Sequence, residues 1–479
     1  MKLLDLNEDV LRLVLEELSP ASLKAVCLLH PRLGSLAQPI LFKAIHFRLR
    51  YERYFQPPGS LEPNAMETAQ LPIIPSLVAT IVRRPDLAVC VRQLSCSAVC
   101  WYTADGGEEE ALKVLAREAD LQEAVSFVLR QTGLSYRHAW VEALRRGSLD
   151  AYLALLVPQL PRLHSLALSN VAFDESDWLG RIARSILHDA GSLGAGMSAR
   201  FEALEDIHLS NTRCPKEDSK RNTANVLAFL QPPSLTRANV AFDRPPEPVL
   251  AWPANHLPSA PRLVSLCVSG IREPQLAQLL AALPGLEQLT WRFGFDVTAA
   301  DEYNTPVVNL ELVLAALARS RHTLTSLTFD VHCADVNDEP ALSQFRLQGT
   351  MEGLAAFDQL TYLEIPLSFL TGFEFPPPAG QPGIERCLPR NLEKLVLGSG
   401  LSIDLDFNWF WPAESRALHE VALWLGEARS WTPRLRKLRL CVVDYNGEMV
   451  PHNVRVTRDM VAERAAAEGV EVKFRYSPP

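Results

Sequence analysis

The chain opens with apolar residues spaced three or four apart, which is the period of one helix face. These residues are Val10, Leu11, Val14, Leu15 and Leu18. Asn7 precedes them as a typical helix cap. Ser19–Pro20 and Pro31 are start signals for a second and a third helix, and Pro39 is expected to end the third. The N-terminus therefore predicts three short helices.

Helices this short cannot enclose all the apolar surface that they carry. The surplus has to lie against another domain or another protein, because an exposed apolar face is typically an interaction site. The alternative interpretation is that the three helices form an ordinary cap on the next domain. Both interpretations predict the same local structure.

Most of the remaining chain repeats the phrase Leu-x-x-Leu-x-Leu or a close relative of it. The copies are Leu163-Leu166-Leu168, Leu204-Ile207-Leu209, a weak copy at Leu235-Ala238-Val240, Leu263-Leu266-Val268, Leu286-Leu289-Trp291, Leu324-Leu327-Phe329, Leu360-Leu363-Ile365, Leu392-Leu395-Leu397 and Leu435-Leu438-Leu440. Val91-Leu94-Cys96 is a possible first member. Helical stretches such as Gln275 to Leu283 separate the copies, so each unit is predicted to be a strand followed by a helix.

Stacked units of this kind form a curved solenoid with one parallel sheet. The copies are 23 to 43 residues apart, which predicts an irregular horseshoe with loop insertions. The insertions are expected at 191–196, 213–222, 243–260, 298–306, 335–345 and 373–386. A helix at 457–468 and a strand at 470–476 are expected to close the solenoid.

Alternate residues of a strand face opposite ways, so the residues between the repeated leucines line the open face of the sheet. The candidates for partner contact on that face are Ser165, Asp206, His208, Arg237, Gln288, Arg292, Asp330, Tyr362, Glu364, Lys394, Lys437 and Arg439. The last three cations suit an acidic segment of a partner. The alternative is a solvated polar face, which every such sheet needs.

Composition narrows the function classes. The net charge is −9, so no global field favours nucleic acid. The chain has no apolar run long enough to span a membrane. Cys96 and Cys100 are four residues apart, but nothing near them completes a zinc site. The nine cysteines are expected to be reduced thiols of a cytoplasmic or nuclear protein.

Enzyme motifs are not found in the sequence. Gly191 to Gly196 superficially suggests a phosphate loop, but it lacks the Lys-Ser/Thr pair that contacts phosphate and metal. Neither a Gly-x-Ser-x-Gly elbow nor a His-Glu-x-x-His motif occurs. We expect no catalytic residue, no cofactor and no metal.

The N-terminal pattern resembles the F-box. The matching residues are Leu4, Leu6, Val10, Leu11, Val14, Leu18, Leu23, Val26, Cys27, Leu33 and Ala37. The segment Pro39 to Phe42 resembles the residues directly after the box in many fungal F-box proteins, and the later repeats resemble the leucine-rich repeat family. The resemblance implies an α/β fold with an F-box at 1–47, a linker and leading helix at 48–86, and an irregular leucine-rich-repeat solenoid at 87–479.

In the F-box family the box docks on the Skp-type adaptor of an SCF ubiquitin ligase, whose core is a cullin. The resemblance assigns adaptor contacts to Leu4, Leu6, Asn7, Val10, Leu11, Val14, Leu18, Leu23, Cys27 and Leu33. It implies a receptor subunit that holds an unknown protein substrate for ubiquitination.

Two other hypotheses remain open. The family usually has Leu-Pro where this chain has Leu6-Asn7, so a repeat scaffold that does not bind the adaptor is one alternative. An enzyme with an unrecognised site in the long insertions is the other.

Overall fold

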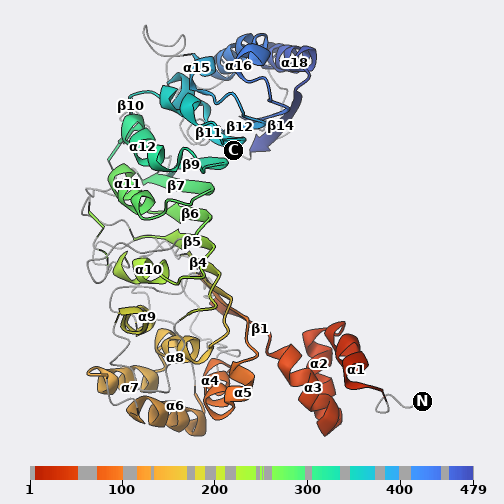
Figure 1. Cartoon of the computed structure of the whole chain (residues 1–479), viewed down its shortest axis with the longest axis vertical. Helices are drawn as coiled ribbons and strands as arrows, with labels where there is room; N and C mark the ends of the chain where they lie inside the picture. The colour runs from red at the N-terminus through yellow and green to blue at the C-terminus, as the bar shows by residue number, and fades with distance from the viewer. Residues whose placement is uncertain are drawn as a thin grey trace, which may run out of the picture. The chain divides into compact units, whose positions relative to one another are not determined.

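The structure is a computed structural model of the chain (Figure 1). It describes residues 6–51, 73–100, 116–130, 134–169, 178–188, 201–210, 223–243, 249–250, 252, 262–296, 305–334, 346–372, 383–398, 412–443 and 452–477. The chain divides into two compact units. Unit 1 is Met1–Asp243 with Ala251–Ala260, and unit 2 is Arg244–Leu250 with Pro261–Pro479.

The three predicted N-terminal helices are present. They are α1 (Glu8–Glu16), α2 (Pro20–Leu29) and α3 (Pro31–Leu41). Asn7 caps α1 by accepting a hydrogen bond from the Asp9 amide at 3.3 Å, and Ser19 caps α2 in the same way. The prediction for Pro39 is wrong, because α3 continues through it to Leu41.

These helices enclose a small core of their own. It consists of Leu11, Leu15, Leu23, Leu33, Leu36 and Ala37. Gly34 lets α2 and α3 approach closely, since a Cβ there would meet the Cys27 carbonyl oxygen at 3.0 Å. The three helices therefore bury these six side chains against one another, without a contribution from the parts of the chain that the structure describes beyond the bundle.

The described residues of unit 1 form five parallel strands in the order β1-β2-β3-β4-β5. They are β1 (Ala44–Tyr51), β2 (Gln93–Cys100), β3 (Ser165–Ser169), β4 (Asp206–Ser210) and β5 (Arg237–Ala241). The sequence placed residues 48–51 in a linker, whereas they complete β1, which pairs with β2 along its whole length. The first strand of the ladder therefore begins directly after α3.

The helices of unit 1 beyond the bundle lie on one side of these strands (Figure 1). They are α4 (Ile73–Arg83), α5 (Pro85–Ala88), α6 (Glu118–Arg130), α7 (Arg137–Arg145), α8 (Leu149–Leu156) with the 3-10 turn Val157–Gln159, α9 (Trp178–His188) and α10 (Thr223–Phe229). The solenoid was predicted to begin at residue 87, but Pro85 opens the short helix α5 there and strand β2 starts at Gln93.

Unit 2 continues the same strand-and-helix pattern. Its parallel strands are β6 (Ser265–Ser269), β7 (Gln288–Asp296), β9 (Ser326–Ala334), β11 (Tyr362–Pro366), β12 (Lys394–Gly398), β13 (Lys437–Val443) and β14 (Glu471–Ser477). A separate parallel pair is β8 (Val307–Asn309) with β10 (Arg346–Gln348). The α-helices are α11 (Glu273–Ala281), α12 (Leu310–Leu317), α14 (Leu367–Thr371), α15 (Ile384–Cys387), α16 (Pro412–Leu425), α17 (Ala428–Trp431) and α18 (His452–Ala467), and the 3-10 helices are Ala318–Ser320 and Glu352–Ala356.

The repeated leucines form the core in both units, as their period predicts. Within each unit the strands pair in register, so that Leu166 lies beside Ile207 and Leu266 beside Leu289. These side chains are buried, while the residues between them are at least partly exposed, except Val396 of β12, which is 1% exposed. The curvature of a horseshoe stays a prediction, and most residues of the expected insertions lie outside the described ranges.

Truncation of one repeated leucine tests this packing. Leu266→Ala removes a side chain that is 1% exposed, and we expect the free energy of unfolding to fall by roughly 2–5 kcal/mol. Leu312→Ala is the matched control, because Leu312 is 47% exposed and its loss leaves no cavity. Chemical denaturation followed by circular dichroism measures both. Equal losses in the two variants would contradict the assignment of Leu266 to the core.

Candidate protein-interaction surfaces

The N-terminal bundle leaves a strip of apolar side chains on α1. Val10, Leu13 and Val14 are 44%, 65% and 45% exposed. Their spacing of three and four residues places them on one side of the helix. We call these residues the α1 strip. Leu28 and Leu29, at the end of α2, are also exposed, at 88% and 73%.

The structure separates the adaptor contacts predicted from the sequence into three groups. Val10 and Val14 are exposed, and Asn7 is exposed but serves as the cap of α1. Leu6, Leu18 and Cys27 are partly buried against the bundle core. Leu11, Leu23 and Leu33 are core residues, so they hold the helices together and offer no surface to a partner. Leu4 lies outside the described residues.

Sequence reasoning missed Leu13, Leu28 and Leu29. The signal for Leu13 is an apolar residue outside the periodic stripe of a short helix, three residues from Val10, a member of the stripe that stays exposed. For the Leu28–Leu29 pair the signal is its position at the end of a helix, directly before the His30 cap of α3.

The open face of the strands in unit 1 is polar, with small side chains on β3 and larger charged or polar ones on β4 and β5. Ser165 is partly exposed. Asp206 on β4 and Arg237 on β5 form an ion pair at 3.6 Å, and His208 Nε2 lies 3.1 Å from the Ser210 hydroxyl. Asp206 and Arg237 therefore compensate each other's charge on this face.

The open face of unit 2 is more strongly charged. Gln288 is exposed at the start of β7, and Arg292 on the same strand pairs with Asp330 of β9 at 3.1 Å. On β11, the Tyr362 hydroxyl donates to Glu364 at 2.7 Å, and Lys394 of β12 lies over the Tyr362 ring at 4.6 Å. Burial and the hydrogen bond to Glu364 raise the pKa of Tyr362, so this hydroxyl stays a donor.

All twelve candidates for partner contact on the strand face are at least partly exposed. The two furthest along the chain are Lys437 and Arg439 of β13. Alternation along a strand predicted this side of the sheet correctly for every candidate. It does not decide between a partner platform and a solvated face.

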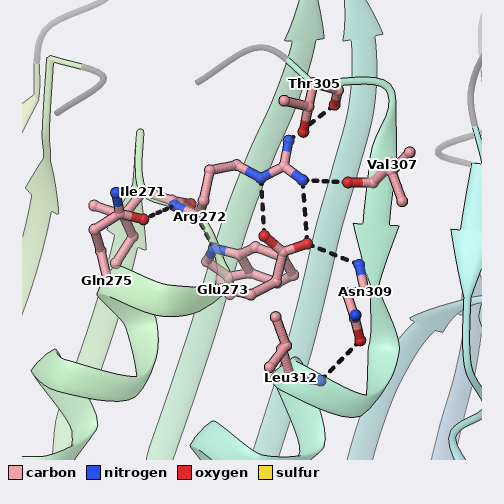
Figure 2. Close-up of polar contacts among 9 residues, drawn as sticks. Ile271, Arg272, Glu273, Gln275, Thr305, Val307, Asn309 and Leu312 are labelled. Atoms are coloured by element: carbon pink, nitrogen blue, oxygen red, sulfur yellow. Dashed lines mark hydrogen bonds and ion pairs between the residues drawn. The ribbon is translucent and has the colours of Figure 1, made fainter. Parts of the chain in front are cut away.

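A buried ion pair in unit 2 was not anticipated from the sequence (Figure 2). Arg272 and Glu273 are 7% and 3% exposed, and the guanidinium donates to both carboxylate oxygens, at 2.9 and 3.2 Å. It also donates to the carbonyls of Thr305, at 2.9 Å, and Val307. The ring of Phe293 lies below it, 4.5 Å from the guanidinium carbon.

The partners of this ion pair show that it is structural. Glu273 accepts from the Asn309 amide at 2.9 Å, and the Asn309 side chain caps α12 through the Leu312 amide (Figure 2). The pair therefore fastens the start of α11 to strand β8 and to the start of α12. Its polar atoms are engaged by the chain itself, so we do not assign a ligand to it.

The described residues contain no group of three or more His, Cys, Asp or Glu side chains placed to hold a metal ion. Burial raises the pKa of the Cys96 and Cys387 thiols to about 12, so both stay protonated and poorly nucleophilic. Among the helices that the structure describes, none combines the length and the apolar character that crossing a bilayer requires.

Comparison with known families agrees with the architecture of unit 1. Residues 64–213 match the family model of the leucine-rich repeat domain. The match includes β2, β3 and β4 with the helices between them. No curated protein matches the chain. The leucine-rich repeat domain and the parallel strands support a scaffold for protein interaction.

Proposed function

We propose that the chain is the substrate-recognition subunit of an SCF-type E3 ubiquitin ligase. In this proposal α1–α3 are an F-box that binds a Skp-type adaptor, and the strand face holds a target protein. The observation that carries the proposal is the α1 strip: the bundle has a complete core, yet Val10, Leu13 and Val14 are left exposed beside it.

The proposed mechanism is positional. The adaptor and cullin bring a ubiquitin-carrying partner close to the target, and tethering raises the effective concentration of the target lysines. The chain itself makes or breaks no bond, and it works in the cytoplasm or nucleus, where its thiols stay reduced. The match to a leucine-rich repeat domain supports the target-binding half of this mechanism.

The adaptor contact is tested by the double variant Val10→Asp, Val14→Asp in the full chain. Two carboxylates in an apolar contact lose their hydration without gaining a partner, so we expect adaptor co-purification to fall at least about tenfold. Both side chains are exposed, and the bundle core is untouched. Affinity purification with the tagged chain measures the effect.

Arg12→Asp is the control, because Arg12 is an exposed residue of the same helix that is outside the α1 strip. It should keep the adaptor. Retention of the adaptor by the double variant, with normal helicity, would remove the F-box proposal. Absence of the adaptor from the unmodified chain would favour the alternative, a repeat scaffold that does not bind it. The departure at Leu6-Asn7 keeps that alternative open, although Asn7 still caps the helix.

A further inference from the structure

Cations gather on the open face of the last three strands of unit 2. They are Lys394 on β12, Lys437 and Arg439 on β13, and Lys473 and Arg475 on β14. We call this set the basic C-terminal face. All five side chains are at least partly exposed. Lys437 lies beside Lys394 in the strand register, and Lys473 lies beside Arg439.

Neighbouring strands are about 4.8 Å apart, and successive residues on one face are about 6.6 Å apart along a strand. The five cations therefore form a compact grid. Their proximity agrees with their effects on neighbouring groups: Arg439 and Arg475 both lower the pKa of Tyr362 against the larger opposing effect of burial, and Lys437 and Arg439 both lower the pKa of Glu471, after the larger effect of Lys473. Like charges on neighbouring strands destabilise a sheet, so a bound anionic partner would relieve the repulsion among these cations.

Carboxylates on this face only partly compensate for the cations. Glu471 is engaged by Lys473 at 2.8 Å, and Glu364 on β11 accepts from Tyr362. Among the described residues of this face, five cations against these two carboxylates leave an excess of three positive charges. Glu393 and Arg436, the exposed residues just before β12 and β13, add one charge of each sign and do not change it. This excess stands out in a chain whose net charge is −9.

We propose that the basic C-terminal face binds an extended acidic segment, rich in Asp and Glu, of the protein that the chain recognises. This inference rests on the proposed function in one respect: the protein that carries the acidic segment is taken to be the target of the ligase. Alternate side chains of an extended segment recur about every 6.6 Å, which matches the cation spacing along β13 and β14. The two arginines supply planar forks that bind carboxylates through paired hydrogen bonds.

The geometry favours a protein segment over nucleic acid. Single strands of nucleic acid are held by stacking on exposed aromatic rings in addition to phosphate contacts. Tyr362, which borders the face, is covered by Lys394, and its hydroxyl is bonded to Glu364. Glu364 and Glu471 would also repel a continuous phosphate backbone, whereas a peptide can place neutral residues opposite them.

The experiment uses the full purified chain without adaptor, and a fluorescein-labelled peptide of alternating Glu and Ser as the probe. Fluorescence anisotropy should show binding that weakens as ionic strength rises from about 0.01 M to about 0.15 M, where the screening length falls from about 30 Å to about 8 Å. The variant Lys437→Glu, Arg439→Glu should bind at least about tenfold more weakly, because it replaces attraction by repulsion at the centre of the face.

The variant Arg319→Glu, Arg346→Glu is the matched control. It makes the same change in net charge at exposed positions of unit 2 that are not on this face, and it should bind the peptide normally. Equal weakening in both reversals, no binding by the unmodified chain, or tighter binding of a single-stranded DNA of equal charge would each overturn the inference.

Failure of the proposed function is distinguishable from failure of this inference. The variant Val10→Asp, Val14→Asp should lose the adaptor and still bind the peptide. If the chain binds the peptide but never binds the adaptor, the inference stands: the basic C-terminal face is then the binding site of a scaffold that is not part of the ligase. Adaptor binding without peptide binding would remove the inference alone.

Discussion

Replacing Glu273 by alanine is expected to lower the free energy of unfolding by about 3–5 kcal/mol, because it leaves a buried charge without its partner. The change leaves the Arg272 guanidinium buried at 7% exposure without its carboxylate. It also removes the acceptor of the Asn309 amide, next to the cap of α12. A buried guanidinium and a half-buried amide therefore both lose their carboxylate acceptor.

Two control variants test whether the loss of stability comes from leaving one buried charge without its partner. Glu287→Ala removes a carboxylate that is exposed, so its effect should stay within about 0.5 kcal/mol. The double variant Arg272→Met, Glu273→Leu removes both charges together and should be less destabilising than Glu273→Ala. Urea denaturation measures all three. A loss below about 1 kcal/mol for Glu273→Ala would show that the pair does not fasten α11 to β8.

The sequence did not predict that this ion pair is buried, because the residues that cover it and bond to it are distant along the chain. Ile271-Arg272-Glu273-Pro274 has the local signature of an ordinary helix start with an acidic first turn. Burial of the charges depends on the return of residues 305–309, more than thirty residues later. A pattern within one window contains no information about that return.

The strands were predictable for the opposite reason. The repeated leucines combine local alternation with recurrence, and each strand then pairs in register with an equivalent neighbour. The same alternation was present in Ile45, Phe47 and Leu49 of β1. The repeated phrase does not reveal this strand, because the segment lies before the first copy of the phrase. The alternation of apolar residues was enough to predict β1, but part of this strand was assigned to a linker.

The N-terminal helices show where periodicity misleads. A stripe of apolar residues on a short helix predicts which side is buried, but not what covers it. In this bundle Leu11 and Leu15 of the stripe belong to the core formed with α2 and α3, while Val10 and Val14 of the same stripe stay exposed. The surface left for a partner combines these two valines with Leu13, which lies beside the stripe. Leu11, Leu23 and Leu33, which the sequence assigns to adaptor contact, lie in the core of this bundle.

Trp291→Ala should lower the free energy of unfolding by about 3–5 kcal/mol, since large aromatic truncations in a core cost that much. Trp291 is fully buried on β7. Its ring stacks on Phe293 at 6.0 Å and meets the edge of Phe329 at 6.2 Å. Its indole N–H donates to the Ile271 carbonyl at 3.1 Å, so truncation also leaves a buried acceptor unpaired.

That hydrogen bond couples Trp291 to the ion pair, because Ile271 directly precedes Arg272 (Figure 2). Residues that share partners are not additive, so the double variant Trp291→Ala, Glu273→Ala should lose less stability than the sum of the single losses. Trp291→Phe keeps a ring without the donor and should cost less than the alanine variant. Trp431→Ala is the matched aromatic control, because Trp431 is 41% exposed. Strict additivity, or a loss in Trp431→Ala as large as in Trp291→Ala, would show that β7 and the start of α11 do not form one packed element.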